Sequence, residues 1–398
     1  MKLLILHPVS IWSLDRFLVA AEFLNYNVTI LTANPTIFDE KIINRCQAVI
    51  QVNESTENPE ELMSQVINKD FDIVIAGSEF AVVSADLVAD NLGCYSNDVE
   101  LIRSARNKRL MRLAFKQQGL PQPEVLGNFK DETGLNILKQ NGLKYPLVIK
   151  PADMLNSLFV TICHDNSELR SIAKKIFDYS KFDLVKHSFT GEVLLEEFAE
   201  GDEYSVEALI KEGKLIFRNV TKKMLSPFPN RFEIGHIVGD DILSDLHHEI
   251  DQICEKIARA WGMPNGVIHL EMMEHNGIIK IIEAAARIPG DRISALIELK
   301  YGISLEYGYI YLRDKSRNDT DFLNIQKQSG YFAVKFLFAN DMAKLSESNM
   351  NINVIDQQKY ATNNNNQLSE KYDVSKRIGH LIACSESLSE LVAWELNR

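Results

Sequence analysis

Two glutamates stand in neighbouring apolar runs whose spacing could build a cation site. Glu271 ends the run 266–271 and Glu283 lies in the run 278–287, with Asn276 and Gly277 between the runs. An Asn-Gly pair favours a tight hairpin because both residues accept the positive φ that such turns demand. The sequence therefore predicts two paired strands that each carry a carboxylate, and carboxylate oxygens are ligands that Mg²⁺ accepts.

The register of this hairpin decides whether the carboxylates meet. A plain two-residue turn places Glu283 opposite Leu270, whereas a three-residue loop or a one-residue bulge centred on Gly277 places Glu283 opposite Glu271. We predict the second arrangement. Like charges that face each other on half-buried strands are destabilising unless a cation lies between them. Mg²⁺, which commonly binds one or two protein carboxylates together with substrate phosphates, would be that cation. The alternative is two separately solvated glutamates.

Basic residues at two other places could contact phosphate. Four of them lie between Arg103 and Arg109, at the start of a helix predicted over 103–118, where they are either solvated or bound to phosphate. Lys150 is the one charged residue of the apolar run 145–151, so it requires an anionic partner. A loop over 152–158 and a strand over 159–163 are predicted to follow it.

Composition limits the classes of partner. A formal net charge of −12 over 398 residues and a pI near 5.3 argue against nucleic acid or an anionic membrane as the main partner. The five cysteines are scattered without CxxC spacing, which is typical of reduced thiols and gives little support to structural zinc. The apolar N-terminal run ends at Pro8 and is predicted to be a strand rather than a signal peptide. We expect a cytoplasmic protein.

The elements that must position these residues alternate between strand and helix from Lys2 to about Leu101. This alternation predicts an α/β fold with an open parallel sheet. No glycine fingerprint follows the first strand, which argues against a dinucleotide site there. The polar run Asn363–Asn366 is predicted to be a loop.

The order of these motifs resembles the ATP-grasp superfamily, and within it the carboxylate-amine ligases that join amino acids into dipeptides. The resemblance covers nearly the whole chain. It implies an ATP-grasp fold with four parts: an N-terminal Rossmann-like domain over 1–101, a central subdomain over 102–190, an ATP- and metal-binding subdomain over 191–303, and a C-terminal closing α+β subdomain over 304–398. Ser375–Ala383 resembles the closing strand of that last part.

The resemblance also implies roles for individual residues. Nucleotide phosphates would be held by Lys108, by Lys150 and by one of the neighbours Lys222 and Lys223, of which we favour Lys223. The segment Glu196, Glu197, Phe198, Ala199 would receive adenine, and Glu203 would hold the ribose hydroxyls. Glu271 and Glu283 would bind the metal.

Three further positions are implied on the substrate side. Arg287, which closes Glu283-Ala-Ala-Ala-Arg287, would face the transferred phosphate, or else pair with Asp291 at the end of a helix. His236, after Gly235, would line the acceptor or acyl pocket. Asp291 would receive an ammonium group or pair with Arg292. His269 is either near the metal-bound substrate or satisfied in the core.

Two positions depart from the family pattern. Ala285 stands where an asparagine usually adds a metal contact, so a third oxygen ligand must come from water or another side chain. The loop over 151–159 contains no glycine, although its backbone N–H groups should approach the phosphates. The loop either still covers phosphate through Asn156 and Ser157 or has lost that task.

The implied function is an ATP-dependent ligase that activates a carboxylate as an acyl phosphate, which an amine attacks to give an amide, ADP and phosphate. Arg287, Lys150 and His236 are the expected catalytic residues, and ATP and Mg²⁺, for which Mn²⁺ could substitute, are the expected cofactors. We expect small-molecule carboxylate and amine substrates, amino acids by default, and the resemblance admits a homodimer. The alternatives are a degenerate nucleotide-binding protein without ligase activity and, ranked last, a biotin-carboxylase-like enzyme.

Overall fold

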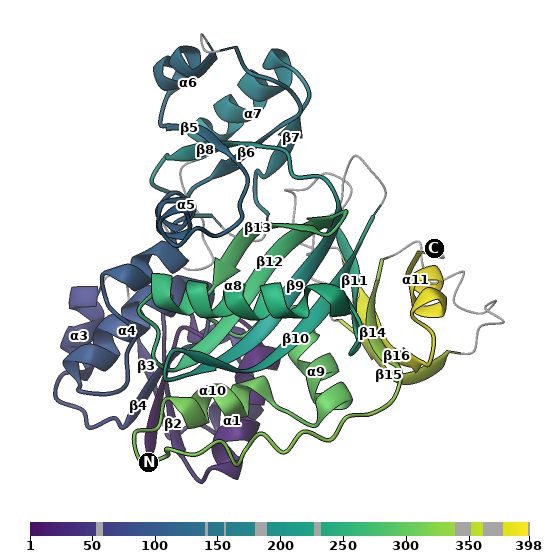
Figure 1. Cartoon of the computed structure of the whole chain (residues 1–398). Helices are drawn as coiled ribbons and strands as arrows, with labels where there is room; N and C mark the ends of the chain where they lie inside the picture. Colours follow the sequence, from purple (N-terminus) through teal and green to yellow (C-terminus); the bar gives the residue numbers. More distant parts are fainter. Residues whose placement is uncertain are drawn as a thin grey trace.

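The computed structural model describes residues 1–52, 59–139, 142–154, 157–179, 189–226, 232–338, 352–360 and 377–396. The predicted loop Asn363–Asn366 and the first residues of the predicted closing strand, Ser375 included, lie outside these ranges. Three sheets organise the described part of the chain (Figure 1). Within it, every helix is too short or too polar to cross a membrane.

The N-terminal sheet is parallel, with strand order β3-β2-β1-β4. Its strands are β1 (Lys2–Leu6), β2 (Asn27–Thr32), β3 (Ala48–Gln51) and β4 (Ile73–Ala76). Helices α1 (Ile11–Phe23), α2 (Glu40–Ile43), α3 (Pro59–Val66) and α4 (Val82–Asn91) connect and flank them. The predicted alternation of strand and helix is confirmed. It places the carboxyl ends of β1 and β4 side by side.

A small antiparallel sheet, of order β5-β8-β6-β7, projects from the rest of the molecule (Figure 1). It contains β5 (Val125–Phe129), β6 (Leu147–Pro151), β7 (Thr161–Cys163) and β8 (Val193–Glu197), with α6 (Glu132–Lys139) and α7 (Asn166–Asp178) packed on it. Leu147, Ile149, Leu169 and Ile176 belong to a hydrophobic cluster that is separate from the other two. This sheet therefore has its own core.

The large sheet has the order β13-β12-β9-β10-β11-β14-β16-β15. Its strands are β9 (Asp202–Lys211), β10 (Lys214–Leu225), β11 (Glu233–Val238), β12 (Gly266–His275), β13 (Ile278–Ala285), β14 (Tyr331–Leu337), β15 (Asn353–Lys359) and β16 (Gly379–Ser385). Alternate residues of β9 face opposite sides, so Ala208 and Leu209 fall in different clusters. Helix α8 (His247–Ala260) covers one face (Figure 1), and α9 (Ile293–Tyr301) and α10 (Leu305–Leu312) cover the other.

The four predicted domains stay a proposal. Strand β8 follows the proposed boundary at residue 190 and pairs with β5 and β6 of the small sheet. Strands β14, β15 and β16 of the proposed closing subdomain continue the sheet that holds β9–β13, and α11 (Leu388–Leu396) packs beside them. Hydrogen bonding thus runs across both boundaries.

The helix predicted over 103–118 is wrong at its start. Residues Leu101–Ala105 form a 3-10 turn, and α5 spans Lys108–Gln117. Asn107 separates the two because its extended backbone and its side chain, which accepts a hydrogen bond from the Leu110 N–H, cap the new helix. The cap turns Lys108, at the first position of α5, into the interior.

Candidate functional site

Glu271 lies directly opposite Glu283 in the β12–β13 ladder, as predicted. The predicted cause of this register is wrong. The turn contains only Asn276 and Gly277, because His275 pairs with Ile278, and the extra residue is instead Ile282 on β13. A bulge at Ile282 shifts the register by one residue between the turn and the glutamates, which brings the two carboxylates to one face.

Arg112 of α5 satisfies the carbonyl groups at this bulge. Its Nη1 donates to the Ile281 carbonyl at 3.1 Å and its Nη2 donates to the Ile282 carbonyl at 2.6 Å. Arg112 is not among the functional residues that the sequence predicts. The signal is its location on the buried side of α5. A buried guanidinium requires hydrogen-bond acceptors, so a specific role for Arg112 could have been expected.

The same guanidinium pairs with Glu196, with 2.6 Å between Arg112 Nε and Glu196 Oε1. The other oxygen of Glu196 lies 2.6 Å from Lys150 Nζ, and all three side chains are buried. Burial raises the pKa of Glu196, but the charges of Lys150 and Arg112 outweigh it and lower this pKa to about 2. Burial and the Arg112 charge lower the pKa of Lys150 to about 8, against the opposing effect of Glu196.

This triad changes how the adenine segment can be used. The Glu196 carboxylate is the counter-ion of two buried cations, so any contact from this residue to a base would come from its backbone. Glu197 turns the other way and pairs with Lys280, and Ala199 is buried. The adenine role of the segment from Glu196 through Ala199 stays a prediction.

Lys108 is buried beside the second glutamate of the hairpin. Its Nζ lies 2.7 Å from Glu283 Oε1 and donates to the Met154 carbonyl at 2.6 Å. Met154 belongs to the loop that lacks glycine. Ser157 and Phe159 of that loop adopt φ of 54° and 60°, the region that glycine usually occupies, while Asn156 lies outside the described residues. Two residues other than glycine, Ser157 and Phe159, therefore adopt the left-handed backbone conformation in this loop.

Lys223, rather than Lys222, points into the site. Its Nζ lies 2.7 Å from Glu203, 2.8 Å from Glu233 and 3.1 Å from Glu271. Although burial lowers the pKa of Lys223, these three carboxylates raise it well above its usual value. Lys222 faces the opposite side of β10 and pairs with the exposed Asp202. The strand period of two therefore separates neighbouring lysines.

His269 is satisfied in a buried polar network. Its Nδ1 lies 3.1 Å from Glu207 Oε1, and its Nε2 lies 3.4 Å from Glu271. Glu207 is fully buried and also accepts hydrogen bonds from the side chains of Ser205, Asn219 and Thr221. His269 therefore orients Glu271 from behind, and the core interpretation of this histidine is confirmed.

His236 lies beside Glu233, the carboxylate that also pairs with Lys223. Its ring is fully buried, with Nε2 3.4 Å from Glu233 Oε2 and 3.7 Å from Asp291 Oδ2. Asp291 does not pair with Arg292, because Arg377 Nη1 donates to its Oδ1 at 2.7 Å. Burial raises the pKa of Asp291, but Arg377 and His236 hold it well below its usual value.

Arg287 pairs with Glu79, and not with Asp291. Its Nη2 and Nε donate to Glu79 Oε2 at 2.8 and 3.1 Å. Glu79 is buried two residues beyond Gly77 at the carboxyl end of β4, and sequence analysis missed it. The signal was available, since ligands of parallel α/β sheets lie at the carboxyl ends of the strands.

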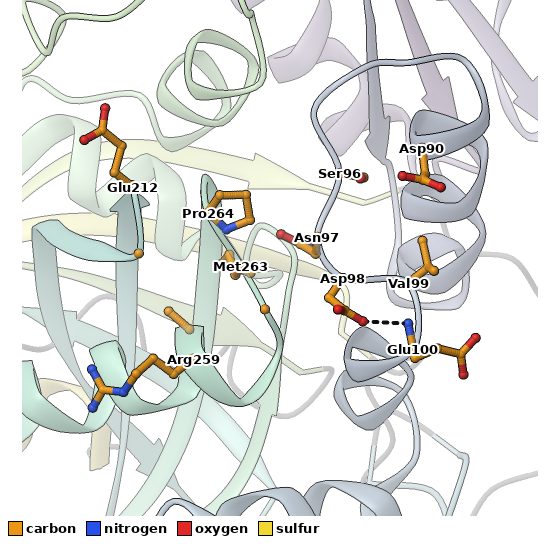
Figure 2. Close-up of a pocket in the computed structure, with 13 residues that line it drawn as sticks. Asp90, Ser96, Asn97, Asp98, Val99, Glu100, Glu212, Arg259, Met263 and Pro264 are labelled. Carbon is orange, nitrogen blue, oxygen red and sulfur yellow. Dashed lines mark hydrogen bonds between the residues drawn. The ribbon is translucent and has the colours of Figure 1, made fainter.

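A groove of about 880 Å³ lies elsewhere, between the loop 96–100 and the turn that precedes β12. Figure 2 shows Asp90, Asp98, Glu100 and Glu212 around it, with Arg259 as the basic residue of its lining. The described lining contains none of the residues predicted for the site. The better candidate is therefore the set of ion-paired side chains around the β12–β13 hairpin, which includes Lys108, Lys150, Lys223, Glu271, Glu283 and His236.

Comparison with known proteins gives a consistent result. The ATP-grasp domain family matches residues 143–295. Dapdiamide A synthase of Enterobacter agglomerans is 30% identical over 61% of this chain, and an L-arginine-specific L-amino acid ligase of Bacillus subtilis is 24% identical over 59%. Each alignment spans 56% of the relative. The crystal structure of an L-amino acid ligase from Bacillus licheniformis superposes with a TM-score of 0.75 at 18% identity, covering 99% of this chain and 95% of that one.

Proposed function

Because this chain contains an ATP-grasp domain and has the ATP-grasp fold, we propose that it is an ATP-dependent carboxylate-amine ligase that acts on amino acids. One acid would be activated as an acyl phosphate, and the amine of a second substrate would form the amide. The observation that carries the proposal is the pairing of Glu271 with Glu283, flanked by Lys108, Lys223 and Arg287.

The donor set fits a divalent metal. Glu271 and Glu283 present hard oxygen atoms on one face, which suits Mg²⁺. Lys223 pairs with Glu271 and Lys108 pairs with Glu283, so each carboxylate has a cationic counter-ion in the structure. When bound there, Mg²⁺ would neutralise phosphate charge and orient the transferred group. Ala285 contributes no ligand atom, so we expect further ligands from phosphate and water.

The other side chains would bind and orient the reactants. Lys150 and Lys108, both buried, would contact phosphate oxygens as point charges. Arg287, held by Glu79, would neutralise the charge that develops on the transferred phosphoryl group. The same cations would stabilise the oxyanion formed when the amine adds to the acyl phosphate. Glu203 would serve the ribose, and His236 would contact the acid or the amine.

The test is release of ADP and phosphate by the purified protein with MgATP across all pairs of the twenty amino acids. Glu283→Gln should abolish release, while Glu249→Gln, which makes the same change at an exposed helix position, should leave it intact. Release with bicarbonate alone would instead support a carboxylase-like reaction. ATP binding without any release would support the degenerate nucleotide-binding alternative.

A further inference from the structure

The groove of about 880 Å³ lies where the N-terminal part of the chain meets the large sheet. One wall is the loop 96–100 that follows α4, and the other is formed by the β9–β10 turn and by the end of α8 with the turn after it. The Asp98 N–H donates to the Gly262 carbonyl at 3.0 Å. A Cβ atom at Gly262 would lie only 2.4 Å from the Asp98 Cβ, so a glycine is required where the two walls touch.

The lining of this groove is acidic. Its charged side chains are Asp90, Asp98, Glu100, Glu212 and Arg259, which gives three more negative charges than positive ones. Glu100 Oε2 lies 3.4 Å from Arg103 Nε. Asp90, Asp98 and Glu212 have no basic side chain within 4.0 Å among the residues that the structure describes. The groove therefore attracts cations and leaves three carboxylates available to pair with them.

Two helices reach the groove, and both do so at their C-terminal ends. Asp90 lies in the last turn of α4, and Arg259 lies in the last turn of α8. The C-terminal end of a helix carries a partial negative charge, which favours a cation and disfavours a carboxylate. Arg259 agrees with this preference, whereas Asp90 opposes it. Asp90 thus costs stability in the free protein, and a bound cation would offset that cost.

Asn97 adds a buried acceptor without a donor. Its side chain is 3% exposed, and its Nδ2 and backbone N–H both donate to Asp86, at 2.7 and 2.9 Å. A carboxylate only accepts hydrogen bonds, so these contacts fix the amide nitrogen toward Asp86. In the described part of the chain the Asn97 Oδ1 has no hydrogen-bond partner, and Figure 2 shows it directed toward Pro264. A buried oxygen is normally hydrogen bonded, so Oδ1 is free to accept from an ammonium group in the groove.

The rest of the lining determines which kind of cation fits. Val99, Met263 and Pro264 give it apolar surface between the carboxylates. No three carboxylates of the groove, all of them described, bring oxygen atoms within 4.8 Å of one another, so they do not converge on one metal ion. Separated charges over apolar surface match ammonium groups joined by methylene chains. The volume is within the range of about 300–1,000 Å³ that is typical of small-molecule sites.

We propose that this groove binds a linear aliphatic polyamine with two or three ammonium groups. One ammonium would donate to Asn97 Oδ1, the others would pair with Asp90 and Glu212, and the methylene chain would cover Met263 and Pro264. The described lining includes none of the residues proposed for the ligase site. The proposal therefore does not depend on ligase activity.

The test is calorimetric titration of the full chain with spermidine, without nucleotide and at low salt. We expect one spermidine per chain, and about tenfold weaker binding in Asn97→Ala because the acceptor is lost. Asp90→Asn and Glu212→Gln should each weaken binding about threefold. The matched control is Glu249→Gln, which removes an exposed charge from the first turn of α8, outside the groove, and should bind as the wild type does.

Asp90→Asn supplies a second measurement that a purely structural role would not predict. The substitution removes a negative charge from the C-terminal end of α4, so the free protein should unfold at a higher denaturant concentration than the wild type. The same variant should bind spermidine more weakly. A variant that is destabilised and binds spermidine normally would show that Asp90 has a structural role instead.

Four results would overturn the proposal. The wild-type protein could bind no spermidine, or Asn97→Ala and the double variant Asp90→Asn/Glu212→Gln could bind it as tightly as the wild type. Glu249→Gln could weaken binding as much as Glu212→Gln, which would indicate diffuse attraction to an acidic chain. Glu283→Gln could lose binding, which would place spermidine in the ligase site.

Two controls complete the experiment. Circular dichroism shows whether Asn97→Ala is folded, and the double variant Asp90→Asn/Glu212→Gln alone decides if it is not. An oligolysine peptide that binds through the same residues when spermidine does not would assign the groove to a basic protein segment and would refute the polyamine. ADP release enters none of these measurements, so failure here leaves the ligase proposal untouched.

Discussion

Arg112 and Glu196 form a buried ion pair that couples the bulge of the β12–β13 hairpin to Lys150 of the small sheet. The Glu196 carboxylate pairs with both Arg112 and Lys150, and the Arg112 guanidinium also donates hydrogen bonds to the Ile281 and Ile282 carbonyls. Arg112 of α5 therefore connects β8 of the small sheet with β13 of the large sheet, so one substitution in this group should affect both stability and the site.

Glu196→Gln should destabilise the protein by about 3–5 kcal/mol, because it leaves Lys150 and Arg112 buried beside each other without a counter-ion. Glu197→Gln is the matched control. Its partner Lys280 is over a third exposed, so the loss should stay below about 1 kcal/mol. Denaturant unfolding of both variants measures the difference, and equal losses would contradict the counter-ion role.

The ATP affinity should depend on the charge of Lys150. Its pKa, about 8 in the folded protein, lies below its ordinary value, so the ammonium is present below pH 8 and is lost as the pH rises through 8. We expect the Kd for ATP to increase between pH 7 and 9, as measured by calorimetry. Arginine stays charged over this range, so the same pH dependence in Lys150→Arg would show that another group is responsible.

Neighbouring lysines on β10 provide an internal comparison. Lys223→Ala removes the shared partner of Glu203, Glu233 and Glu271, so repulsion among the remaining carboxylates should unfold the protein at lower denaturant and abolish ADP release. Lys222→Ala removes a pair with the exposed Asp202 and a contact with the Tyr204 ring, and should cost about 1 kcal/mol. ADP release and denaturant unfolding curves of the two variants measure this difference. A similar loss in both would refute the assignment of Lys223.

Glu79→Gln should lower the rate of ADP release without weakening ATP binding. The amide removes the charge that positions Arg287, and a misplaced catalytic group can cost about a hundredfold in rate. A comparison of kcat with the Kd for ATP separates this positioning role from a binding role. Weaker ATP binding at unchanged kcat would assign Glu79 to the nucleotide instead.

The sequence predicted what local patterns control. Apolar periodicity located β12 and β13, and Asn276-Gly277 located their turn, so the hairpin that carries Glu271 and Glu283 could be predicted, whereas their register depends on a bulge in β13. The bulge at Ile282 could not, because Arg112, which binds its carbonyls, lies 170 residues away in the chain. The role of Glu79 could not be predicted for the same reason, because its partner Arg287 follows 208 residues later. The β12–β13 hairpin was predictable, whereas its long-range partners were not.

The pairing of Glu79 with Arg287 has a consequence for synthesis on the ribosome. At roughly 5–20 residues per second, the 208 residues between them take about 10–40 s to emerge. During that interval the parallel sheet can fold while Glu79 still lacks the guanidinium that accompanies its burial. Until then Glu79 has only the nearby charges of Arg106 and Lys108, and its ion pair forms when the segment after β13, which carries Arg287, has been translated.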